Sequence, residues 1–267
     1  MKSYQKFIYG MATLLAVCWL VPVYLISISA FSTRKSVNAW PKSWWPAEFS
    51  LDTLQFFTNF TGVWQAVGNS VIVAVITMVL SIVLGAPAGY ALARYDFKGQ
   101  TVYRLLIVMT RAFPIAILAL PLVTRFISLG LYDTHLGVAL VHTALALPFS
   151  ILVSSSLFMG IPRELEEAAW TLGCNKWQAF MRIVMPLALP GMAATMIFSF
   201  VVSWNEVFSA SVLTLSKRTL TAFLFAGLEE SPLHFRFAGG FFLILPSLVF
   251  IFMVRKYLFS MWGISNR

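Results

Sequence analysis

Six long stretches of this sequence restrict the fold more than any other feature, because they contain no Asp, Glu, Lys or Arg apart from Arg111. These stretches are 7–31, 63–93, 105–124, 136–161, 183–205 and 237–254. Each stretch is long enough to cross a bilayer as a helix, which takes about 20 residues. Because the backbone must satisfy its own hydrogen bonds in lipid, we expect these stretches to be helical. A transmembrane barrel would instead show alternating segments of about ten residues. We therefore expect an all-α integral membrane protein whose six transmembrane helices cover approximately residues 7–31, 65–93, 104–126, 136–160, 187–212 and 237–259.

The composition agrees with a single transmembrane domain over residues 1–267. Charged residues make up 11% of the chain, whereas soluble domains carry about 25%. The net charge of +9 comes from Lys and Arg residues spread between the apolar stretches, not from one basic patch, so we expect no nucleic-acid partner. The first stretch exceeds the ~7–15 residues of a signal-peptide core, which indicates a retained span.

The distribution of Lys and Arg sets the expected orientation, since basic residues favour cytoplasmic loops. More of them fall on the inner side if both termini are cytoplasmic, which predicts an N-in, C-in topology. The outer segment 32–62 is then the longest outer loop, and it is too short for a separate domain.

The longest polar segment on the inner side is the loop 161–190, between the fourth and fifth expected spans. Acidic residues near its start favour a short helix, and Gly173 is placed to end that helix in a left-handed conformation. Asn175 is placed to cap a second short helix, and Pro186 and Pro190 are expected to interrupt the pattern before the fifth span. Helix connections usually take about 2–8 residues, so this long structured loop suggests a docking surface; the alternative is a helix lying on the lipid.

This loop resembles the EAA loop of binding-protein-dependent ABC importer permeases. The family pattern is Glu-Ala-Ala, a Gly four residues after the second Ala, and then an Ile and two Pro residues. The residues that match are Glu167, Ala168, Ala169, Gly173, Ile183, Pro186 and Pro190. Leu172 stands where the family usually has Asp. The segments 69–70, 88–99, 130–134 and 204–206 look like those of the carbohydrate-type, maltose-transporter-like branch.

The resemblance implies a transmembrane permease subunit of an ATP-driven importer, multi-pass in the bacterial cytoplasmic (inner) membrane. It implies that Glu167, Ala168, Ala169 and Gly173 form the element that couples to an ATPase subunit, with Glu167 paired to a basic group there. The small alanines would let the helix enter a groove. The implied solute is a sugar or a related polyol or glycoside; a phosphorylated polyol or an oligopeptide is the alternative.

The same resemblance implies the partners. They are a second permease subunit, two ATP-binding subunits, an extracytoplasmic solute-binding protein and membrane lipid. The resemblance to the carbohydrate-type branch favours a second permease of different sequence, and a second copy of this chain is the alternative. We expect the solute-binding protein to contact the outer loops. This sequence lacks the G-x-x-x-x-G-K-[ST] loop that cradles nucleotide phosphates, so ATP and Mg are expected in the partner and no cofactor in this chain.

Polar side chains within the spans are candidates for the solute path. Trp204, Asn205 and Glu206 offer an indole, an amide and an acid in succession, and these groups suit sugar hydroxyls. Glu206 is expected beyond the midplane of the fifth span, toward the outside. The alternative for Glu206 is a helix-packing pair with Arg111 or His142. A charge within a span costs at least about 2.5–3.5 kcal/mol, so Arg111 either faces a water-filled path or snorkels to the inner surface. The path candidates are Asn69, Arg111, Trp204, Asn205 and Glu206.

Two further features concern helix packing. The small residues at 85–89 are expected to allow close helix approach, with a partner permease as one candidate neighbour. Prolines within the spans are expected to kink their helices. These prolines are Pro114, Pro121, Pro148 and Pro246.

Two other classes of function fit the sequence less well. A stand-alone secondary carrier driven by protons would show several acids within its spans, and only Glu206 is so placed. A membrane enzyme would need convergent catalytic or metal-binding groups, but the three His residues share no ligand spacing and neither G-x-S-x-G nor H-E-x-x-H occurs. We therefore expect no catalytic and no metal site.

Overall fold

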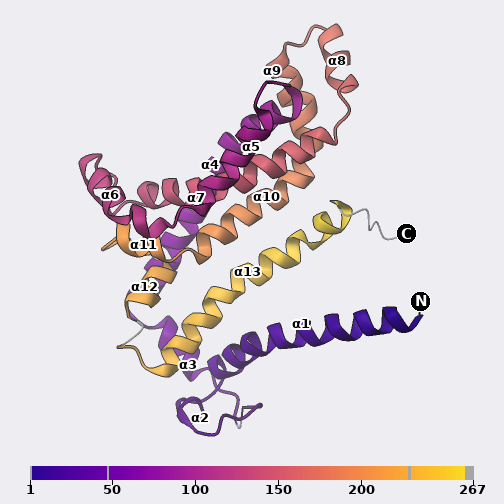
Figure 1. The fold of residues 1–267 in the computed structure, drawn as a ribbon. Coiled ribbons are helices and arrows are strands. Elements are labelled where there is room, and N and C mark those ends of the chain that lie inside the picture. Colours follow the sequence, from indigo (N-terminus) through magenta and orange to yellow (C-terminus); the bar gives the residue numbers. More distant parts are fainter. Residues whose placement is uncertain (1, 47, 228–229, 262–267) are drawn as a thin grey trace. The chain divides into compact units, whose positions relative to one another are not determined.

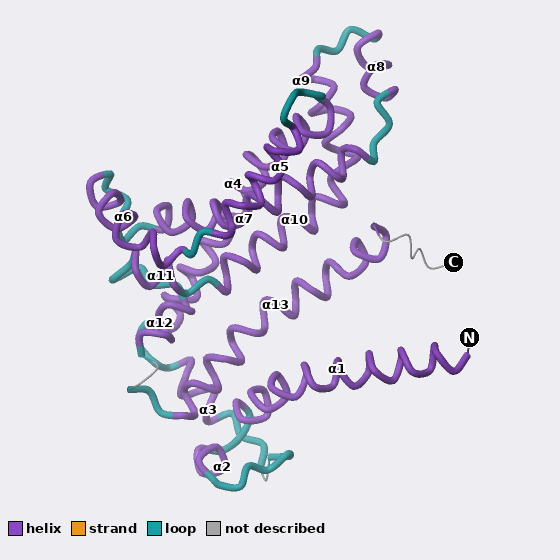
Figure 2. The backbone as a smooth tube through the Cα atoms, viewed as in Figure 1, coloured by secondary structure: helices purple, strands orange, loops and turns teal. Residues whose placement is uncertain are grey.

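The computed structural model describes residues 2–46, 48–227 and 230–261, and the regular elements in these ranges are helices (Figures 1 and 2). Five helical stretches there are long and apolar enough to cross a membrane, and a sixth crossing arises if one bent pair counts as a single span. The all-α prediction is confirmed; the side on which each loop lies stays a prediction. The long helices are α1 (Lys2–Ala30), α4 (Val63–Arg94), α7 (His135–Met159), α10 (Met185–Asn205) and α13 (Leu233–Met261).

The chain divides into two compact units, which are described separately. The first comprises Met1–Gln65 and Leu224–Pro246, and the second comprises Ala66–Phe223 and Ser247–Arg267. Short helices complete both units. They are α2 (Arg34–Asn38), α3 (Asp52–Thr58), α5 (Gln100–Met109), η1 (Thr110–Ala112), α6 (Ile115–Ser128), α8 (Glu164–Thr171), α9 (Lys176–Ala179), η2 (Phe180–Val184), α11 (Phe208–Leu213) and α12 (Leu220–Ala226).

In the first unit, aromatic packing joins α3 to the first half of α13. The ring of Phe57 is fully buried, and its centroid lies 4.9 Å from that of Phe235 and 5.0 Å from that of Phe242. The Thr53 hydroxyl donates a 2.8 Å hydrogen bond to the Ser32 carbonyl, which holds α3 against the residues that follow α1. The segment expected as the longest outer loop is therefore partly helical.

In the second unit, α4, α7 and α10 run alongside one another, with α8 and α9 at one end and α6 and α11 at the other (Figure 1). Two apolar clusters fill this bundle. The cluster nearer α8 contains Ile82, Ala86, Phe158, Phe180, Val184, Ala188 and Met192. The cluster nearer α11 contains Val73, Phe126, Val138, Ala139, Val141, Ala210, Leu213 and Ala222.

The small residues of α4 pack against α7 of the same chain. A Cβ atom added to Gly89 would lie 2.7 Å from the Ser154 Cβ and 2.8 Å from the Ile151 carbonyl oxygen, closer than real Cβ atoms come. The close approach was predicted from the sequence, but α7 occupies the surface for which a partner permease was one candidate. Glycine at this position sets the distance between the two helices.

The third expected span, 104–126, is divided into two helices, and its crossing of the membrane as a single span stays a prediction. The segments 100–112 and 115–128 meet at an angle of 85°. Proline has no N–H to donate and disfavours the helical conformation in the residue before it, so Phe113 is extended ahead of Pro114. The break thus falls at a proline from which a kink was expected. Pro121, by contrast, lies inside α6.

The fifth span also differs from its prediction, because Lys176–Asn205 is one helical stretch. Pro186 and Pro190 were expected to interrupt the chain before the span, but both lie within α10. A π-helical turn, η2, precedes them, and in it the N–H of Met185 donates to the Phe180 carbonyl five residues earlier. This wider turn accommodates a proline that cannot donate. At the other end α10 stops at Asn205, so residues up to 212 belong to the separate helix α11.

The Gly89 contact gives a stability prediction. Gly89→Ala should lower the free energy of unfolding in detergent micelles by about 1–3 kcal/mol, because the new methyl group overlaps the α7 backbone. The matched control is Gly68→Ala in the same helix, where nothing lies within 4 Å of an added Cβ. Equal unfolding free energies for the two variants, measured by steric trapping, would contradict the packing described here.

Candidate functional site

The helix α8 ends in a turn that only a residue tolerant of left-handed backbone can make. Gly173 has a φ of 90°, and its N–H donates to the Trp170 carbonyl while the N–H of Cys174 donates to Ala169. This pair of bonds is a Schellman motif, which satisfies carbonyls at the end of α8. The left-handed helix end predicted at Gly173 is confirmed, although the residue before it is Leu172 and not Asp, and the role of Gly173 in coupling stays a prediction.

The second helix of the loop starts where the sequence predicts. The Asn175 side chain accepts from the N–H of Gln178 at 2.8 Å, and the Gln178 side chain accepts from the N–H of Asn175 at 2.9 Å. This reciprocal capping box fixes the start of α9. Gly173 and Asn175 together hold α8 and α9 at a defined bend.

One face of α8 is anchored to α4 by a buried ion pair. The Glu166 carboxylate lies 2.5 Å from Arg94 Nε, and the side chains of Arg94 and Glu166 are only 8% and 3% exposed. The Tyr90 hydroxyl donates to the second oxygen of the same carboxylate. Arg94 also donates to the Ile161 carbonyl at 2.9 Å. Ala169, one turn along from Glu166, is buried on the same face.

The opposite face of α8 is exposed. It carries Glu167 and Ala168, together with the apolar side chains of Leu165 and, after the helix ends, Leu172, which is 86% exposed. Of the two alanines expected to keep the helix slim for a groove, Ala168 is therefore available and Ala169 packs inward. The exposed side of α8 combines acidic with apolar side chains, which suits contact with a protein surface.

A pocket of about 220 Å³ lies beside Glu167, between α8, α9 and the end of α4. Its lining is rich in charged and aromatic groups. The lining residues are Tyr90, Arg94, Tyr95, Arg163, Glu166, Glu167, Trp170 and Lys176.

The sequence reasoning missed Arg94, Glu166 and Tyr90. Two signals pointed to them: Glu166 shares a helix face with Ala169, and Arg94 ends a span on the side where the loop begins. An acid and a base expected on the same side of the membrane, next to a predicted helix, could have been paired. The sequence does not indicate which face of α8 packs against α4 and which face is exposed.

At the other end of the bundle, the path candidate Asn69 is tied to its own chain. Its side-chain nitrogen donates to the Arg218 carbonyl at 3.0 Å, and its oxygen lies 2.8 Å from His135 Nε2. The neighbouring Ser70 hydroxyl accepts from the N–H of Leu220 at 2.7 Å. These contacts fasten the start of α4 to the loop before α12.

Asp133 fastens the same loop from the start of α7. Its carboxylate accepts from the N–H groups of Leu215, Ser216 and Lys217 at 3.0–3.1 Å, and from the Ser216 hydroxyl at 2.5 Å. Burial acts to raise the pKa of this carboxyl, but the hydrogen bonds outweigh it and lower the pKa from 3.8 to about 2.

Glu206 sits where α10 ends and α11 begins. One carboxylate oxygen lies 3.1 Å from His142 Nε2, and the carboxylate accepts from the N–H groups of Phe208 and Ser209. His142 is fully buried, and its Nδ1 lies 2.7 Å from the Ser203 hydroxyl. The helix-packing alternative for Glu206 is thus realised with His142 as the partner, and contact with a solute stays a prediction.

The remaining path candidates differ in exposure. Trp204 is 3% exposed and stacks on Phe200, with centroids 5.9 Å apart. Asn205 is exposed and donates to the Val201 carbonyl at 2.9 Å. Arg111 is exposed in η1, and among the described residues no hydrogen bond or ion pair joins it to Glu206. Its water-facing and snorkelling alternatives both stay predictions.

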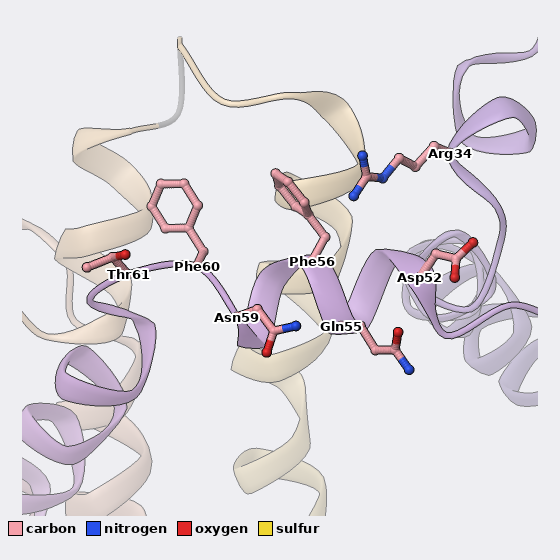
Figure 3. Close-up of a pocket in the computed structure, with 7 residues that line it drawn as sticks. All are labelled: Arg34, Asp52, Gln55, Phe56, Asn59, Phe60 and Thr61. Carbon is pink, nitrogen blue, oxygen red and sulfur yellow. The ribbon is translucent and has the colours of Figure 1, made fainter.

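The first unit carries an open pocket of about 740 Å³ in the segment expected outside the membrane (Figure 3). The Arg34 guanidinium lies 4.4 Å from the centroid of the Phe56 ring. The lining residues are Arg34, Asp52, Gln55, Phe56, Asn59, Phe60 and Thr61.

Solved structures identify the class of fold. The chain matches, with a TM-score of 0.74 and 23% identity, the crystal structure of a bacterial ABC transporter involved in the import of the acidic polysaccharide alginate, over 96% of this chain and 98% of that one. It matches the inward-facing MetNI methionine ABC transporter with a TM-score of 0.57 and 15% identity, over 77% and 98% of the two chains. The fold is that of an ABC transporter membrane subunit.

Sequence comparison identifies the family. Residues 81–258 match the family described as binding-protein-dependent transport system inner membrane component. The trehalose transport system permease protein SugB of Mycobacterium tuberculosis is 34% identical over 215 residues, which cover 75% of this chain and 77% of SugB. The diacetylchitobiose uptake system permease protein NgcG of Streptomyces coelicolor is 31% identical over 211 residues, covering 77% and 68%.

The chain therefore belongs to the family of binding-protein-dependent transport system inner membrane components. Its members are permease subunits of the inner membrane and not enzymes, as the resemblance of the loop implied.

The Asp133 cluster gives a prediction with a defined pH range. Because the pKa is lower in the folded protein, the contribution of the carboxylate is complete above the ordinary pKa of 3.8 and is lost as the pH falls through about 2. Hydrogen-exchange protection at residues 215–217, corrected for intrinsic rates, should stay constant from about pH 8 to pH 5.

Asp133→Asn should lower this protection several-fold at all these pH values, because an amide accepts more weakly than a carboxylate. Asp52→Asn, in the exposed first turn of α3, serves as the charge control. Protection in the unaltered protein that falls steadily between about pH 8 and pH 5 would contradict the lowered pKa.

Proposed function

We propose that this permease forms one half of the translocation path of an ATP-driven importer and couples to an ATP-binding subunit through α8. The observation that carries the proposal is the two-sided character of α8. Its inner face is fastened to α4 through the ion pair of Glu166 with Arg94. Its outer face, with Glu167, Ala168 and Leu172, is exposed and accessible to a partner protein. Burial of an ion pair costs desolvation and adds little net stability, so we do not expect such a pair to hold a helix that only lies on lipid.

Each residue of the EAA motif has a role in this proposal. Glu167 pairs with a basic group of the ATP-binding subunit, and the pocket beside it has room for a partner side chain. Ala168 keeps the outer face slim enough to enter a groove, and Ala169 lets the inner face approach this chain closely. Gly173 turns the chain sharply between α8 and α9.

The energy source and the other partners follow from the same proposal. Two ATP-binding subunits hold ATP and Mg, because this chain has no phosphate-cradling loop. A second permease subunit of different sequence completes the path. A solute-binding protein docks on the outer side, where the pocket of Figure 3 offers Arg34, Asp52 and aromatic rings as contacts.

The solute we propose is a sugar or a related polyol or glycoside. Relatives in the family are named for the transport of trehalose, diacetylchitobiose, arabinooligosaccharides and alpha-glucosides. Asn205 and Arg111 are the exposed path candidates, and we take Asn205 as the contact with a solute because it stands in the Trp-Asn-Glu segment and its side-chain oxygen keeps capacity to accept. Trp204 and Glu206 would then shape the path from behind, and Asn69 and Arg111 would line its ends.

Reversal of the charge at Glu167 tests the docking surface. Glu167→Lys should lower the amount of ATP-binding subunit that co-purifies by about tenfold or more, because it sets like charges against each other at an interface. Glu48→Lys, an exposed acid on the expected outer side, is the matched control and should leave the yield unchanged. Normal co-purification and normal solute uptake with Glu167→Lys would contradict the proposal.

Truncation of Asn205 tests the solute path. Asn205→Ala should raise the sugar concentration for half-maximal uptake by about threefold to tenfold, the loss expected for one neutral hydrogen bond. Asn38→Ala is a close control, because that exposed side chain also donates at 2.9 Å to the carbonyl four residues earlier. An unchanged concentration dependence would remove Asn205 from the path.

A further inference from the structure

We propose that Arg94 and Glu166 are positioning residues that fasten the coupling helix to α4, so that α4 moves together with α8 when the ATP-binding subunits close. This inference rests on the coupling role proposed for α8. It concerns the buried face of the helix, whereas the family motif concerns Glu167 on the exposed face.

Both oxygens of the Glu166 carboxylate and two nitrogens of the Arg94 guanidinium form hydrogen bonds. One oxygen of Glu166 meets Arg94 Nε at 2.5 Å, and the other accepts from the Tyr90 hydroxyl. Arg94 reaches past this contact to the Ile161 carbonyl at 2.9 Å, in the linker that leads from α7 into α8. Tyr90 and Arg94 are four residues apart on α4 and so share one face of it. Tyr90 and Arg94, on two adjacent turns of α4, therefore hydrogen-bond both α8 and the linker that precedes it.

The burial of the Arg94–Glu166 ion pair bears on whether the pair contributes stability or fixes the position of α8. Buried ion pairs add little net stability compared with apolar packing, but the loss of one partner leaves an uncompensated charge. The same space could be filled by apolar side chains if only stability mattered. A paired carboxylate and guanidinium, unlike apolar contacts, fix direction and register between two helices. This property suits a joint that must transmit force.

Further contacts stiffen the joint around the end of α4. Arg163, just before α8, donates to the Arg94 carbonyl at 3.2 Å. Arg104 of α5 donates to the Leu92 carbonyl at 3.0 Å. The Tyr90 ring lies 4.6 Å from the Phe180 ring at the start of the π turn. A displacement of α8 therefore moves α4 and the helix that continues from η2, because these contacts keep the linker between α7 and α8 from yielding.

The test uses the complete transporter in proteoliposomes and measures solute imported per ATP hydrolysed. Glu166→Gln and Arg94→Gln should each lower this ratio by about tenfold, while the ATP-binding subunits still co-purify. Glu164→Gln, an exposed acid on the same helix, is the control and should stay within about twofold. A general loss of folding would lower import and coupled hydrolysis together and leave the ratio unchanged.

Hydrogen exchange across residues 164–171 provides a second measurement that needs no transport. Both single variants should speed exchange there by about tenfold, and Tyr90→Phe, which keeps the ion pair, should speed it by less. Ratios and exchange rates within about twofold of the unaltered protein would overturn the inference. The proposed function fails separately, if no ATP-binding subunit co-purifies with the unaltered chain.

Discussion

Lipid offers a peptide group no hydrogen-bond partner, and this constraint governs where the chain departs from regular helix. Three breaks between helices in the second unit bring their own polar partners. The end of α8 is closed by Gly173 and Cys174, and the start of α11 by the Glu206 carboxylate. Asp133 accepts from the backbone of the loop that follows α11. The carboxylates of Asp133 and Glu206 therefore satisfy backbone N–H groups where the helices end.

The constraint also separates two kinds of polar residue in this permease. Asn69, Glu206 and His142 are occupied by contacts within the chain, which hold helices in register. Asn205, the last residue of α10, and the outer face of α8 remain exposed. In the account proposed here, the first kind builds the path and the second kind contacts solute and partner.

Local sequence patterns predicted much of this structure because they report on single helices. The apolar stretches, the left-handed Gly173 and the cap at Asn175 all depend on neighbours within a few residues. The 85° break at Pro114 and the π turn before Pro186 depend on what packs against those prolines, so the sequence indicated a perturbation without its form. Gly89 signalled a close approach but not its partner, and Glu166 differs from Glu167 only in the direction it faces.

The central claim is that the outer face of α8 meets an ATP-binding subunit, and photo-cross-linking from that face tests it most directly. A photoreactive amino acid at Leu172, which is 86% exposed, should cross-link to the ATP-binding subunit in native membranes. The same group at Leu120 in α6, which is 74% exposed at the opposite end of the bundle, should not (Figure 1). Cross-links from Leu172 to lipid alone, or to the ATP-binding subunit from Leu120 only, would contradict the account.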